Sequence, residues 1–229
     1  MAVRAPGRDD FEDQIYFEEN EMERLGVDVQ LETEASIETV RSFGPQAVVI
    51  ATGSVPRVPD DVEGLDLPHV AQGWDVIKGK VETGERVAIV SQEDYYETPT
   101  IAEYLANKGK QVHVFHKSMH VGYEIARYSV AMVLGHMENV GVEVTPNLVL
   151  TKIDADGLDF VSSFGGHHTY RKEGFDSVVL IYGSVPVHGL YDQLKADGDI
   201  EQVYIAGSAW LPRFMAEATQ HGATVGMAI

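Results

Sequence analysis

The sequence contains no cysteine, few basic residues and no long hydrophobic run. Without cysteine, the chain itself cannot form disulfides, use thiol redox chemistry or ligate an iron–sulfur cluster through thiolates. The 36 acidic residues outnumber the 17 lysines and arginines, and the net charge is −19. Such a surface repels nucleic acid and anionic membranes, so neither is expected as a partner. No apolar stretch is long enough to cross a membrane and the N-terminus lacks a signal-peptide pattern, so a cytoplasmic location is expected.

Strands and helices are predicted to alternate through the middle of the sequence. In the first helix of this region, Thr98 can act as the N-cap, Pro99 fits the first turn, and Gly109 ends the helix. This alternation is typical of a parallel sheet. The predicted elements are a strand at Arg86–Val90, a helix at Thr98–Lys108, a strand at Gln111–His116, a helix at Ser129–Asn139, a polar hairpin region from Val142 to Arg171 and a strand at Ser177–Ile181.

Two pairs of similar segments indicate an internal duplication. MERLGVDVQ begins at Met22 and MENVGVEVT at Met137, and each reads as a helix end, a glycine stop and a short strand. AVVIATGSVP (Ala47–Pro56) is matched by SVVLIYGSVP (Ser177–Pro186), a buried strand followed by the same Gly-Ser-Val-Pro turn. Two matches in the same order favour duplication over chance.

The first copy is expected to be incomplete. Far fewer residues precede Met22 than separate Arg86 from Met137, so roughly 30 residues, a strand and its phosphate turn, have no counterpart. A strand at Gln202–Ala206 and a helix from about Pro212 are interpreted as returning to this first domain. The predicted fold is therefore α/β, with two Rossmann-like dinucleotide-binding domains. Residues 1–80 with 203–229 would form the first, truncated domain, and residues 81–202 the second, inserted within it.

The loop that should bind phosphate in the inserted domain has no glycine. Dinucleotide-binding turns need glycines because bare backbone curls around a pyrophosphate at a helix N-terminus. In the loop Ser91–Glu97 two tyrosines instead fill space, and Glu93, Asp94 and Glu97 repel phosphate. No acidic residue follows the next strand to hold a ribose hydroxyl. Binding of NAD(P) is therefore not expected.

Four motifs together resemble a known flavoprotein family. They are the turn Ala51-Thr52-Gly53, the late Gly-x-x-x-x-Pro-Arg at Gly207–Arg213, APGRDDF at Ala5–Phe11, and the run VIATGSVPRVPDDVEGLD. They are similar to the C-terminal half of old-yellow-enzyme-like dehydrogenases: trimethylamine, dimethylamine and histamine dehydrogenases and dienoyl-CoA reductase. The resemblance implies FAD, or ADP alone, as the bound nucleotide. It also implies a partner chain or N-terminal half whose barrel carries FMN and an iron–sulfur cluster.

The resemblance assigns candidate cofactor-binding residues to two turns. Gly53 would let the backbone approach a nucleotide closely. Ser208 stands where the family has an aspartate, so it can hydrogen-bond a flavin side chain only without charge assistance. The candidate residues are Ala51, Thr52, Gly53, Ser54, Gly207, Ser208 and Trp210.

No catalytic or metal-binding group is predicted. His113 and His116 fall on opposite faces of a strand, and His167 and His168 lie in a glycine-rich turn. The chain is interpreted as the nucleotide-binding, electron-transfer-supporting portion of a flavin-dependent oxidoreductase, not catalytic alone. The alternative is a non-catalytic interaction or scaffold subunit that keeps the fold without a nucleotide.

Overall fold

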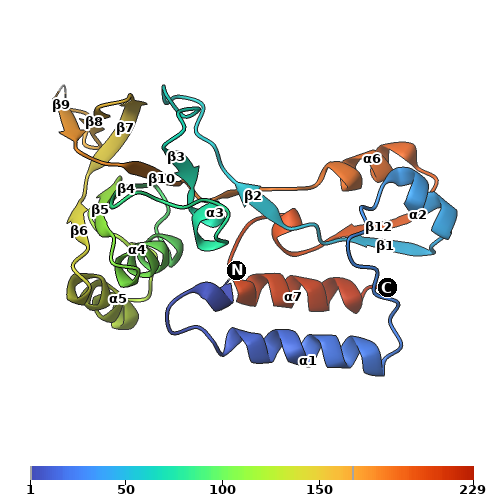
Figure 1. Cartoon of the computed structure of the whole chain (residues 1–229). Coiled ribbons are helices and arrows are strands. Elements are labelled where there is room, and N and C mark those ends of the chain that lie inside the picture. Colours follow the sequence, from blue (N-terminus) through green and yellow to red (C-terminus); the bar gives the residue numbers. More distant parts are fainter. Residues whose placement is uncertain (1, 167) are drawn as a thin grey trace. The chain divides into compact units, whose positions relative to one another are not determined.

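Residues 2–166 and 168–229 are described by the structure, which is a computed structural model. The chain divides into two compact units. Unit 1 comprises Met1–Glu21 and Val58–Gly183, and unit 2 comprises Met22–Arg57 and Ser184–Ile229. Figure 1 labels the elements of both. The division at residues 1–80 with 203–229 and at 81–202 stays a prediction.

Unit 1 is built on a five-stranded parallel sheet with strand order β3-β10-β4-β5-β6. Its central strands are rich in β-branched residues and almost entirely buried, as expected when both faces of a sheet are covered. The strands are β3 (Val70–Gln72), β4 (Arg86–Ser91), β5 (Gln111–His116), β6 (Glu143–Thr145) and β10 (Ser177–Ile181).

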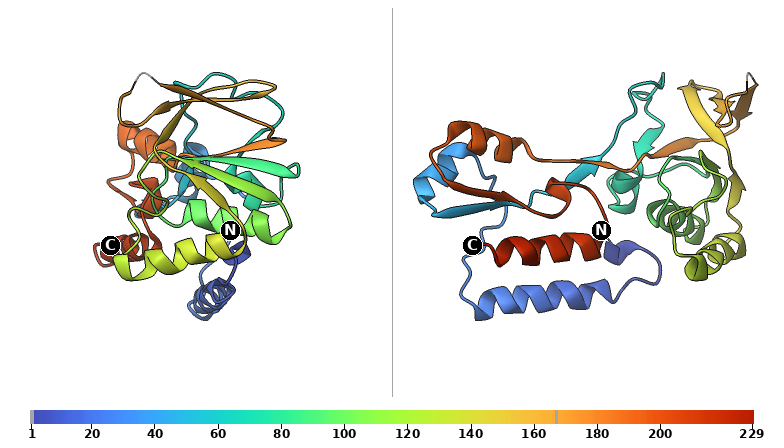
Figure 2. Two further views of the ribbon diagram at one scale, coloured as in Figure 1. Left: turned by 90° about the vertical axis from the view of Figure 1, so that its left-hand side faces the viewer. Right: turned by 180° about the vertical axis from the view of Figure 1, so that it is seen from behind.

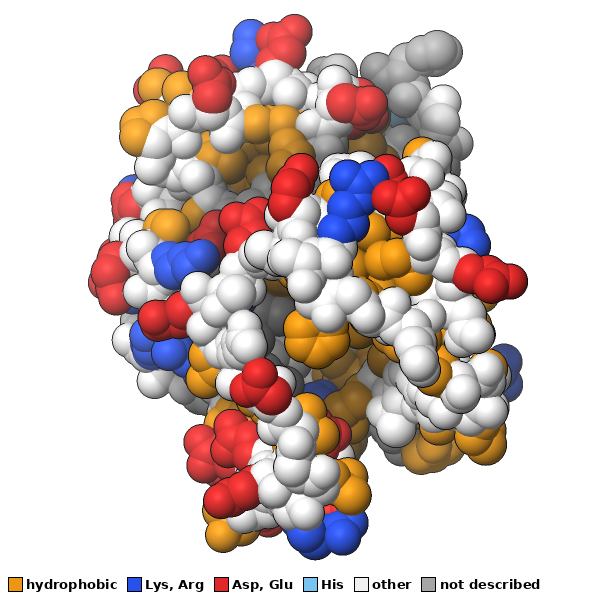
Figure 3. Space-filling view, turned by 90° about the vertical axis from the view of Figure 1, so that its right-hand side faces the viewer, with side chains coloured by type: hydrophobic (Ala, Val, Ile, Leu, Met, Phe, Trp, Pro, Cys, Tyr) orange, Lys and Arg blue, Asp and Glu red, His pale blue; other side chains and the backbone are white. Residues whose placement is uncertain are grey.

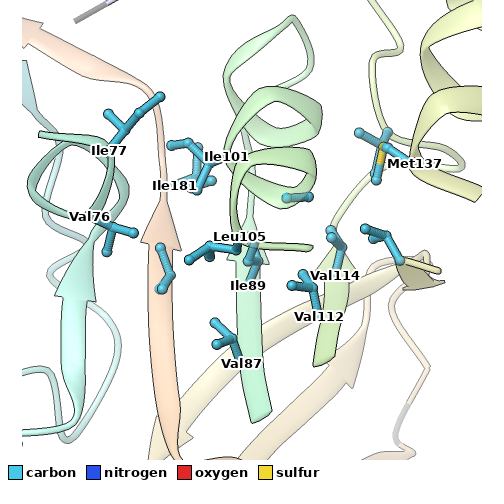
Figure 4. Packing of buried hydrophobic residues seen from close by; sticks show 14 of the residues in the cluster. Val76, Ile77, Val87, Ile89, Ile101, Leu105, Val112, Val114, Met137 and Ile181 are labelled. Atoms are coloured by element: carbon cyan, nitrogen blue, oxygen red, sulfur yellow. The ribbon is translucent and has the colours of Figure 1, made fainter. Parts of the chain in front are cut away.

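Three helices, α3 (Gly73–Ile77), α4 (Glu97–Asn107) and α5 (Arg127–Asn139), cover one face of this sheet. Alternate strand residues such as Val87 and Ile89 point into this layer, because successive side chains of a strand face opposite sides. Figure 4 shows them packed against Ile101 and Leu105 of α4 and Val76 and Ile77 of α3.

The opposite face of the sheet is covered by a second, antiparallel sheet. Its strands are β7 (Leu148–Ile153), β8 (Gly157–Ser162) and β9 (Thr169–Glu173). Ala88 and Val90 of β4 point into this layer, where Phe115 meets Phe160 at a ring-centroid distance of 4.9 Å. Figure 2 shows the yellow to orange strands of this second sheet on the side away from the green helices.

The prediction of two Rossmann-like dinucleotide-binding domains, the second inserted in a truncated first, is wrong. Such a domain carries helices on both faces of its parallel sheet, whereas an antiparallel sheet covers one face in unit 1. Among the described residues of unit 2, only β1 and β12 pair in parallel. The strand–helix alternation that prompted the prediction is common to many α/β folds, so it could not discriminate between them.

Unit 2 contains two small ladders and several short helices. β1 (Ala47–Ile50) pairs in parallel with β12 (Gln202–Ile205), and β2 (Ser54–Pro56) pairs antiparallel with β11 (Ser184–Pro186). The two Gly-Ser-Val-Pro turns predicted as repeats therefore pair with each other. α2 (Ile37–Phe43) and α6 (Gly189–Asp197) pack on β1 and β12, and η2 (Gly207–Ala209) and α7 (Met215–Gly226) follow β12.

α2 shows how local sequence ends a helix in this unit. The Ser36 hydroxyl accepts a hydrogen bond from the Thr39 amide at 3.3 Å, while the Thr39 hydroxyl accepts one from the Ser36 amide at 2.7 Å. Gly44 then ends the helix at φ +66°, a left-handed conformation that favours glycine. α2 is thus held in place at both ends.

The remaining segments are η1 (Ala2–Arg4) and α1 (Phe11–Arg24). The strand expected after Gly26 does not form, although the matching sequence after Gly141 forms β6 beside β5. Several hydrophobic side chains around Gly26 and on α2 and β1 of unit 2 are exposed, namely Leu25, Val27, Val29, Leu31, Phe43 and Val49. Figure 3 shows exposed hydrophobic side chains between acidic and basic ones on one face.

Candidate functional site

The two turns that were predicted to bind a cofactor lie at the same edge of the β1–β12 ladder. Ile50 at the end of β1 is in register with Ile205 at the end of β12, and the Ala206 amide donates to the Ile50 carbonyl at 2.8 Å. The chain therefore leaves both parallel strands at their carboxyl ends, toward residues 51–54 and 207–210. Ligands of open α/β sheets commonly bind beyond this edge.

The first turn offers open space beside Gly53. This residue has φ +76°, and no protein atom lies within 4 Å of the position that a Cβ atom would take. Two polar groups of this turn are already hydrogen-bonded within the chain. The Thr52 hydroxyl donates to the Val187 carbonyl, and the Val187 amide donates to the Gly53 carbonyl at 3.0 Å. Ala51 is exposed, and Ser54 begins β2. The exposed residues Ala51 and Thr52 and the open space beside Gly53 are thus the accessible part of this turn.

The second turn packs against helix α7. Gly207 has φ +59°, and an added Cβ would lie 3.6 Å from the Ala218 Cβ. The Gly207 amide donates to His221 Nδ1 at 3.3 Å, and the Trp210 ring meets the His221 ring at 4.9 Å and 61°. Together with Leu211, Arg213 and Glu217 these residues line a small hollow. Trp210 itself is 58% exposed, so its ring can contact another molecule.

His221 was not predicted as part of this site. It lies three residues after Ala218, whose Cβ faces Gly207. Residues at this spacing share a helix face. That spacing is the signal that could have identified it. The helix itself begins at Met215, not at Pro212, so its N-terminus lies further from Gly207 along the chain than expected.

In unit 1 the glycine-free loop after β4 supplies its own anion to helix α4. The Glu93 carboxylate accepts hydrogen bonds from the amides of Tyr95 at 2.8 Å and Thr98 at 3.1 Å. The Thr98 hydroxyl also lies 2.5 Å from the Ser91 hydroxyl, and both are fully buried. The amides of Tyr95 before α4 and of Thr98 in its first turn, which would otherwise attract a phosphate, are therefore satisfied by the chain itself.

Burial raises the pKa of two glutamates in this loop. The pKa of Glu93 is raised mainly by burial, opposed by the hydrogen bonds from Thr98 and Tyr95. Burial, together with the Glu93 charge, raises the pKa of Glu97 to about 8, opposed by a hydrogen bond with Trp74. Glu97 therefore keeps its proton at neutral pH, which avoids two adjacent buried negative charges.

Asp94 ties the same loop to the end of β5. Its carboxylate accepts from His116 Nε2 at 2.9 Å and from the Ser118 hydroxyl at 3.0 Å. Burial lowers the pKa of His116, opposed by its hydrogen bond to Asp94, so the ring stays neutral and donates through Nε2. Asp94 is therefore a structural acceptor that connects two strand ends.

The other histidines are engaged in separate contacts. His113 Nε2 lies 2.7 Å from the Thr145 hydroxyl, and its ring stacks on Phe115. In the part of the chain that the structure describes, no three His, Asp or Glu side chains group as metal ligands. His167, one of the predicted hairpin histidines, lies outside the described residues. No described helix is long and apolar enough to cross a membrane.

A family model matches the part of unit 1 that contains both sheets. Residues 72–179, from the end of β3 into β10, match the family described as OYE-like second alpha/beta domain. This match replaces the Rossmann-like domain that was predicted for the inserted segment, and it agrees with the layers described above. Helices cover one face and an antiparallel sheet covers the other.

Curated and solved relatives are all much longer than this chain. N,N-dimethylglycine/sarcosine dehydrogenase of Chromohalobacter salexigens is 29% identical, over 89% of this chain and 31% of that protein. Dimethylamine dehydrogenase of Hyphomicrobium sp. (strain x) is 26% identical, over 80% of this chain and 29% of that protein. The structure of 2-naphthoyl-CoA reductase with 2-naphthoyl-CoA has a TM-score of 0.88 at 27% identity. The match covers 100% of this chain and 34% of that chain. The chain thus spans about a third of these relatives.

The resemblance drawn from the motifs is confirmed at this coarser level, since an amine dehydrogenase and a CoA-ester reductase are among the relatives. The finer interpretation, a C-terminal half made of FAD- and NAD(P)-binding domains, was partly wrong, because the family match is to a different domain type. Residues 72–179 match the model of an OYE-like second alpha/beta domain, in a chain that is similar to oxidoreductases such as dimethylamine dehydrogenase and 2-naphthoyl-CoA reductase.

Proposed function

We propose that this chain is a nucleotide-binding portion of a flavin-dependent oxidoreductase, and that it supports electron transfer without carrying the reaction itself. The observation that carries this proposal is the common position of the Gly53 and Gly207 turns at the carboxyl edge of β1 and β12. The names of the relatives, dehydrogenases and reductases, support an oxidoreductase role. The chain's net charge of −19 is compatible with this role and disfavours nucleic acid as a partner.

FAD or ADP is the nucleotide proposed for unit 2. The residues present fit such a group at Gly53, where open space beside a left-handed glycine lets another molecule approach the backbone. Ser54, Ser208 and the exposed Trp210 ring would supply uncharged polar and stacking contacts. Bound FAD would supply a group that accepts and passes on electrons, whereas ADP would only stabilise the unit.

NAD(P) is not proposed as a ligand of unit 1. The Glu93 carboxylate lies on the amides of Tyr95 and Thr98, where a nucleotide phosphate would otherwise be attracted. A phosphate would have to displace this carboxylate and would be repelled by Asp94 as well. Both effects disfavour a dinucleotide at this helix.

A barrel that carries FMN and an iron–sulfur cluster is proposed as the catalytic partner. The relatives extend well beyond the matched region, which leaves room in each of them for a further domain. This chain has no cysteine, so the thiolates of a cluster would have to come from that partner. Substrate chemistry would then take place on the partner.

Native mass spectrometry of the full chain with added FAD or ADP tests the proposal. A mass increment that is lost on denaturation is the expected result. Gly53→Leu should weaken binding at least tenfold, because its side chain fills the space beside the turn. Gly198→Leu is the matched control, since Gly198 has φ +77° and an equally open Cβ position elsewhere in unit 2. If the wild-type chain binds neither FAD nor ADP, nucleotide binding at this turn is refuted. Equal loss of binding in Gly53→Leu and Gly198→Leu would also refute it.

A scaffold subunit that binds no nucleotide is the second candidate, and the Glu93 contacts favour it. The Glu93 carboxylate already accepts from the amides of Tyr95 and Thr98, so these donors need no bound phosphate. Co-purification of a nucleotide-free chain with a separate flavoprotein chain would support this role. A chain that elutes alone beside that flavoprotein in size-exclusion chromatography would exclude it.

A further inference from the structure

Unit 1 contains a groove that neither the motifs nor the comparisons assign. It lies between the N-terminal segment, helix α4 and helix α5, and its volume is about 470 Å³. Small-molecule sites commonly have volumes of about 300–1,000 Å³. The lining residues include Arg8, Phe11, Tyr96, Thr100, Glu103 and Met132. The groove is separate from the Gly53 and Gly207 turns, which belong to unit 2.

Arg8 is the arginine that lines this groove, and no residue that the structure describes accepts a hydrogen bond from its guanidinium. The guanidinium carbon lies 4.8 Å from the Tyr96 ring centroid and 5.9 Å from that of Phe11. These rings hold the planar group and leave its N–H edge free. Within residues 2–166 and 168–229 the Arg8 side chain forms no hydrogen bond or ion pair. Because Arg8 is half-buried, its donors are also partly shielded from water.

The groove has apolar side chains on part of its wall and polar ones on the rest. Phe11, Tyr96, Pro99 and Val133 present rings and aliphatic groups, and the polar lining includes Thr100 of α4 and His136 of α5. An apolar wall next to a forked cation suits a molecule with a hydrophobic body and one planar anionic end.

Two carboxylates restrict which anion can enter. Asp10 and Glu103 line the same groove, and neither pairs with Arg8 within the described residues. Their charges oppose any anion, and they repel a dianion about twice as strongly as a monoanion. The groove therefore favours a monocarboxylate over a phosphate.

We propose that this groove binds a small organic monocarboxylate, with the carboxylate on the Arg8 guanidinium edge and the apolar body against Phe11, Tyr96 and Val133. The contact is bidentate, because the Arg8 fork matches the two carboxylate oxygens. Glu103 lowers the affinity and thereby sets the preference for single charge.

Titration of the full chain with phenylacetate, followed by the ¹⁵N–¹H resonance of Arg8 Nε, tests this site. Saturable shifts at concentrations on the order of millimolar are expected. Phenylacetamide, a neutral isostere, and inorganic phosphate should each bind at least tenfold more weakly. Absence of saturation with phenylacetate, or equal binding of phenylacetamide, would overturn the proposal.

Variants distinguish a direct contact between Arg8 and the ligand from a general effect of positive charge on phenylacetate binding. Followed by backbone amide shifts of α4, Arg8→Gln should weaken phenylacetate binding at least tenfold. Arg127→Gln, which removes an exposed arginine of α5, should leave it unchanged. Glu103→Gln should strengthen it roughly two- to fivefold. If Arg8→Gln does not fold, Arg8→Lys keeps the charge and should still weaken binding by losing the fork. Unchanged binding in the folded Arg8 variant would place the ligand elsewhere.

Discussion

The Thr98 amide donates a hydrogen bond of 3.1 Å to the carboxylate of Glu93, five residues earlier in the chain. This contact explains how a loop without glycine can precede a helix at the carboxyl end of a parallel strand. Glycine-rich turns at this position bring backbone amides to an external anion. Here the chain provides a side-chain carboxylate, and the loop needs no left-handed residue to do so.

Removing this carboxylate should weaken helix α4. Glu93→Ala leaves the amides of Tyr95 and Thr98 without their acceptor, and loss of such a cap typically costs about 0.5–2 kcal/mol. Urea unfolding at pH 6 measures the free energy of unfolding. Glu138→Ala, at an exposed position of α5, is the control and should change it by less than about 0.5 kcal/mol. Equal effects of the two variants would contradict the capping role of Glu93.

Glu97 should make the protein less stable as the pH rises. Its pKa is raised to about 8 in the folded chain by burial and the Glu93 charge, against an ordinary value of 4.5. Between these values the folded state holds a proton that the unfolded state has released. The free energy of unfolding therefore falls with increasing pH, by at most about 1.4 kcal/mol per pH unit, and the effect is complete above pH 8.

Comparison with Glu97→Gln isolates this effect, because glutamine is uncharged at every pH. The difference in unfolding free energy between wild type and variant should change from pH 5 to pH 8 and then level off. Glu138→Gln makes the same replacement at an exposed position of α5 and is the matched control. A constant difference for Glu97→Gln would mean that its pKa is not raised in the folded chain.

The repeat at Met22 and Met137 shows how far the sequence could predict this fold. Strands β5 and β10 were predicted with the observed bounds, and helices α4 and α5 to within two residues, because hydrophobic periodicity is a local property. The predicted N-cap Thr98 lies instead inside α4, which begins at Glu97. Of the two similar segments, only the one after Gly141 forms a strand, since β5 lies beside it. A strand needs a second strand beside it to pair its backbone hydrogen-bonding groups, and the local sequence does not show whether such a strand is present.

The layers and the site depended on contacts between distant residues. Phe115 and Phe160 are far apart in the sequence, and their packing puts a sheet where a helix was expected. Gly53 and Gly207 were identified from short motifs, and their common edge follows from the pairing of β1 with β12. His221 was missed because a single histidine in a helix carries no motif of its own. The element types within residues 86–116 were thus predictable, while the partners of the strands were not.

Two glycines with similar backbone angles should respond very differently to alanine. Gly53 has φ +76° and open space, so Gly53→Ala should cost only the left-handed strain of about 1–2 kcal/mol. Gly64 has φ +86°, and an added Cβ would lie 2.0 Å from the Ile153 carbonyl oxygen. The carbonyl of the neighbouring Glu63 accepts a hydrogen bond from the Ile153 amide at 2.8 Å. Strand β7 therefore cannot move away from Gly64 without breaking this bond.

Gly64→Ala should therefore destabilise the protein by about 2–5 kcal/mol, the sum of left-handed strain and overpacking. Thermal unfolding of Gly53→Ala and Gly64→Ala under identical conditions compares the two costs. A melting temperature of Gly64→Ala equal to that of Gly53→Ala would show that the Glu63–Ile153 contact is looser than the structure indicates.

The antiparallel sheet should be as important for stability as the helical layer. Phe160 of β8 is fully buried and packs against Phe115 of the parallel sheet, so Phe160→Ala removes contacts between the two sheets. Deletion of a buried phenylalanine ring typically costs about 3–5 kcal/mol. Phe164 lies just beyond β8 and is 73% exposed, so Phe164→Ala should change the unfolding free energy by less than about 0.5 kcal/mol. Similar small effects of both variants would mean that the second face of the parallel sheet is not covered by β8.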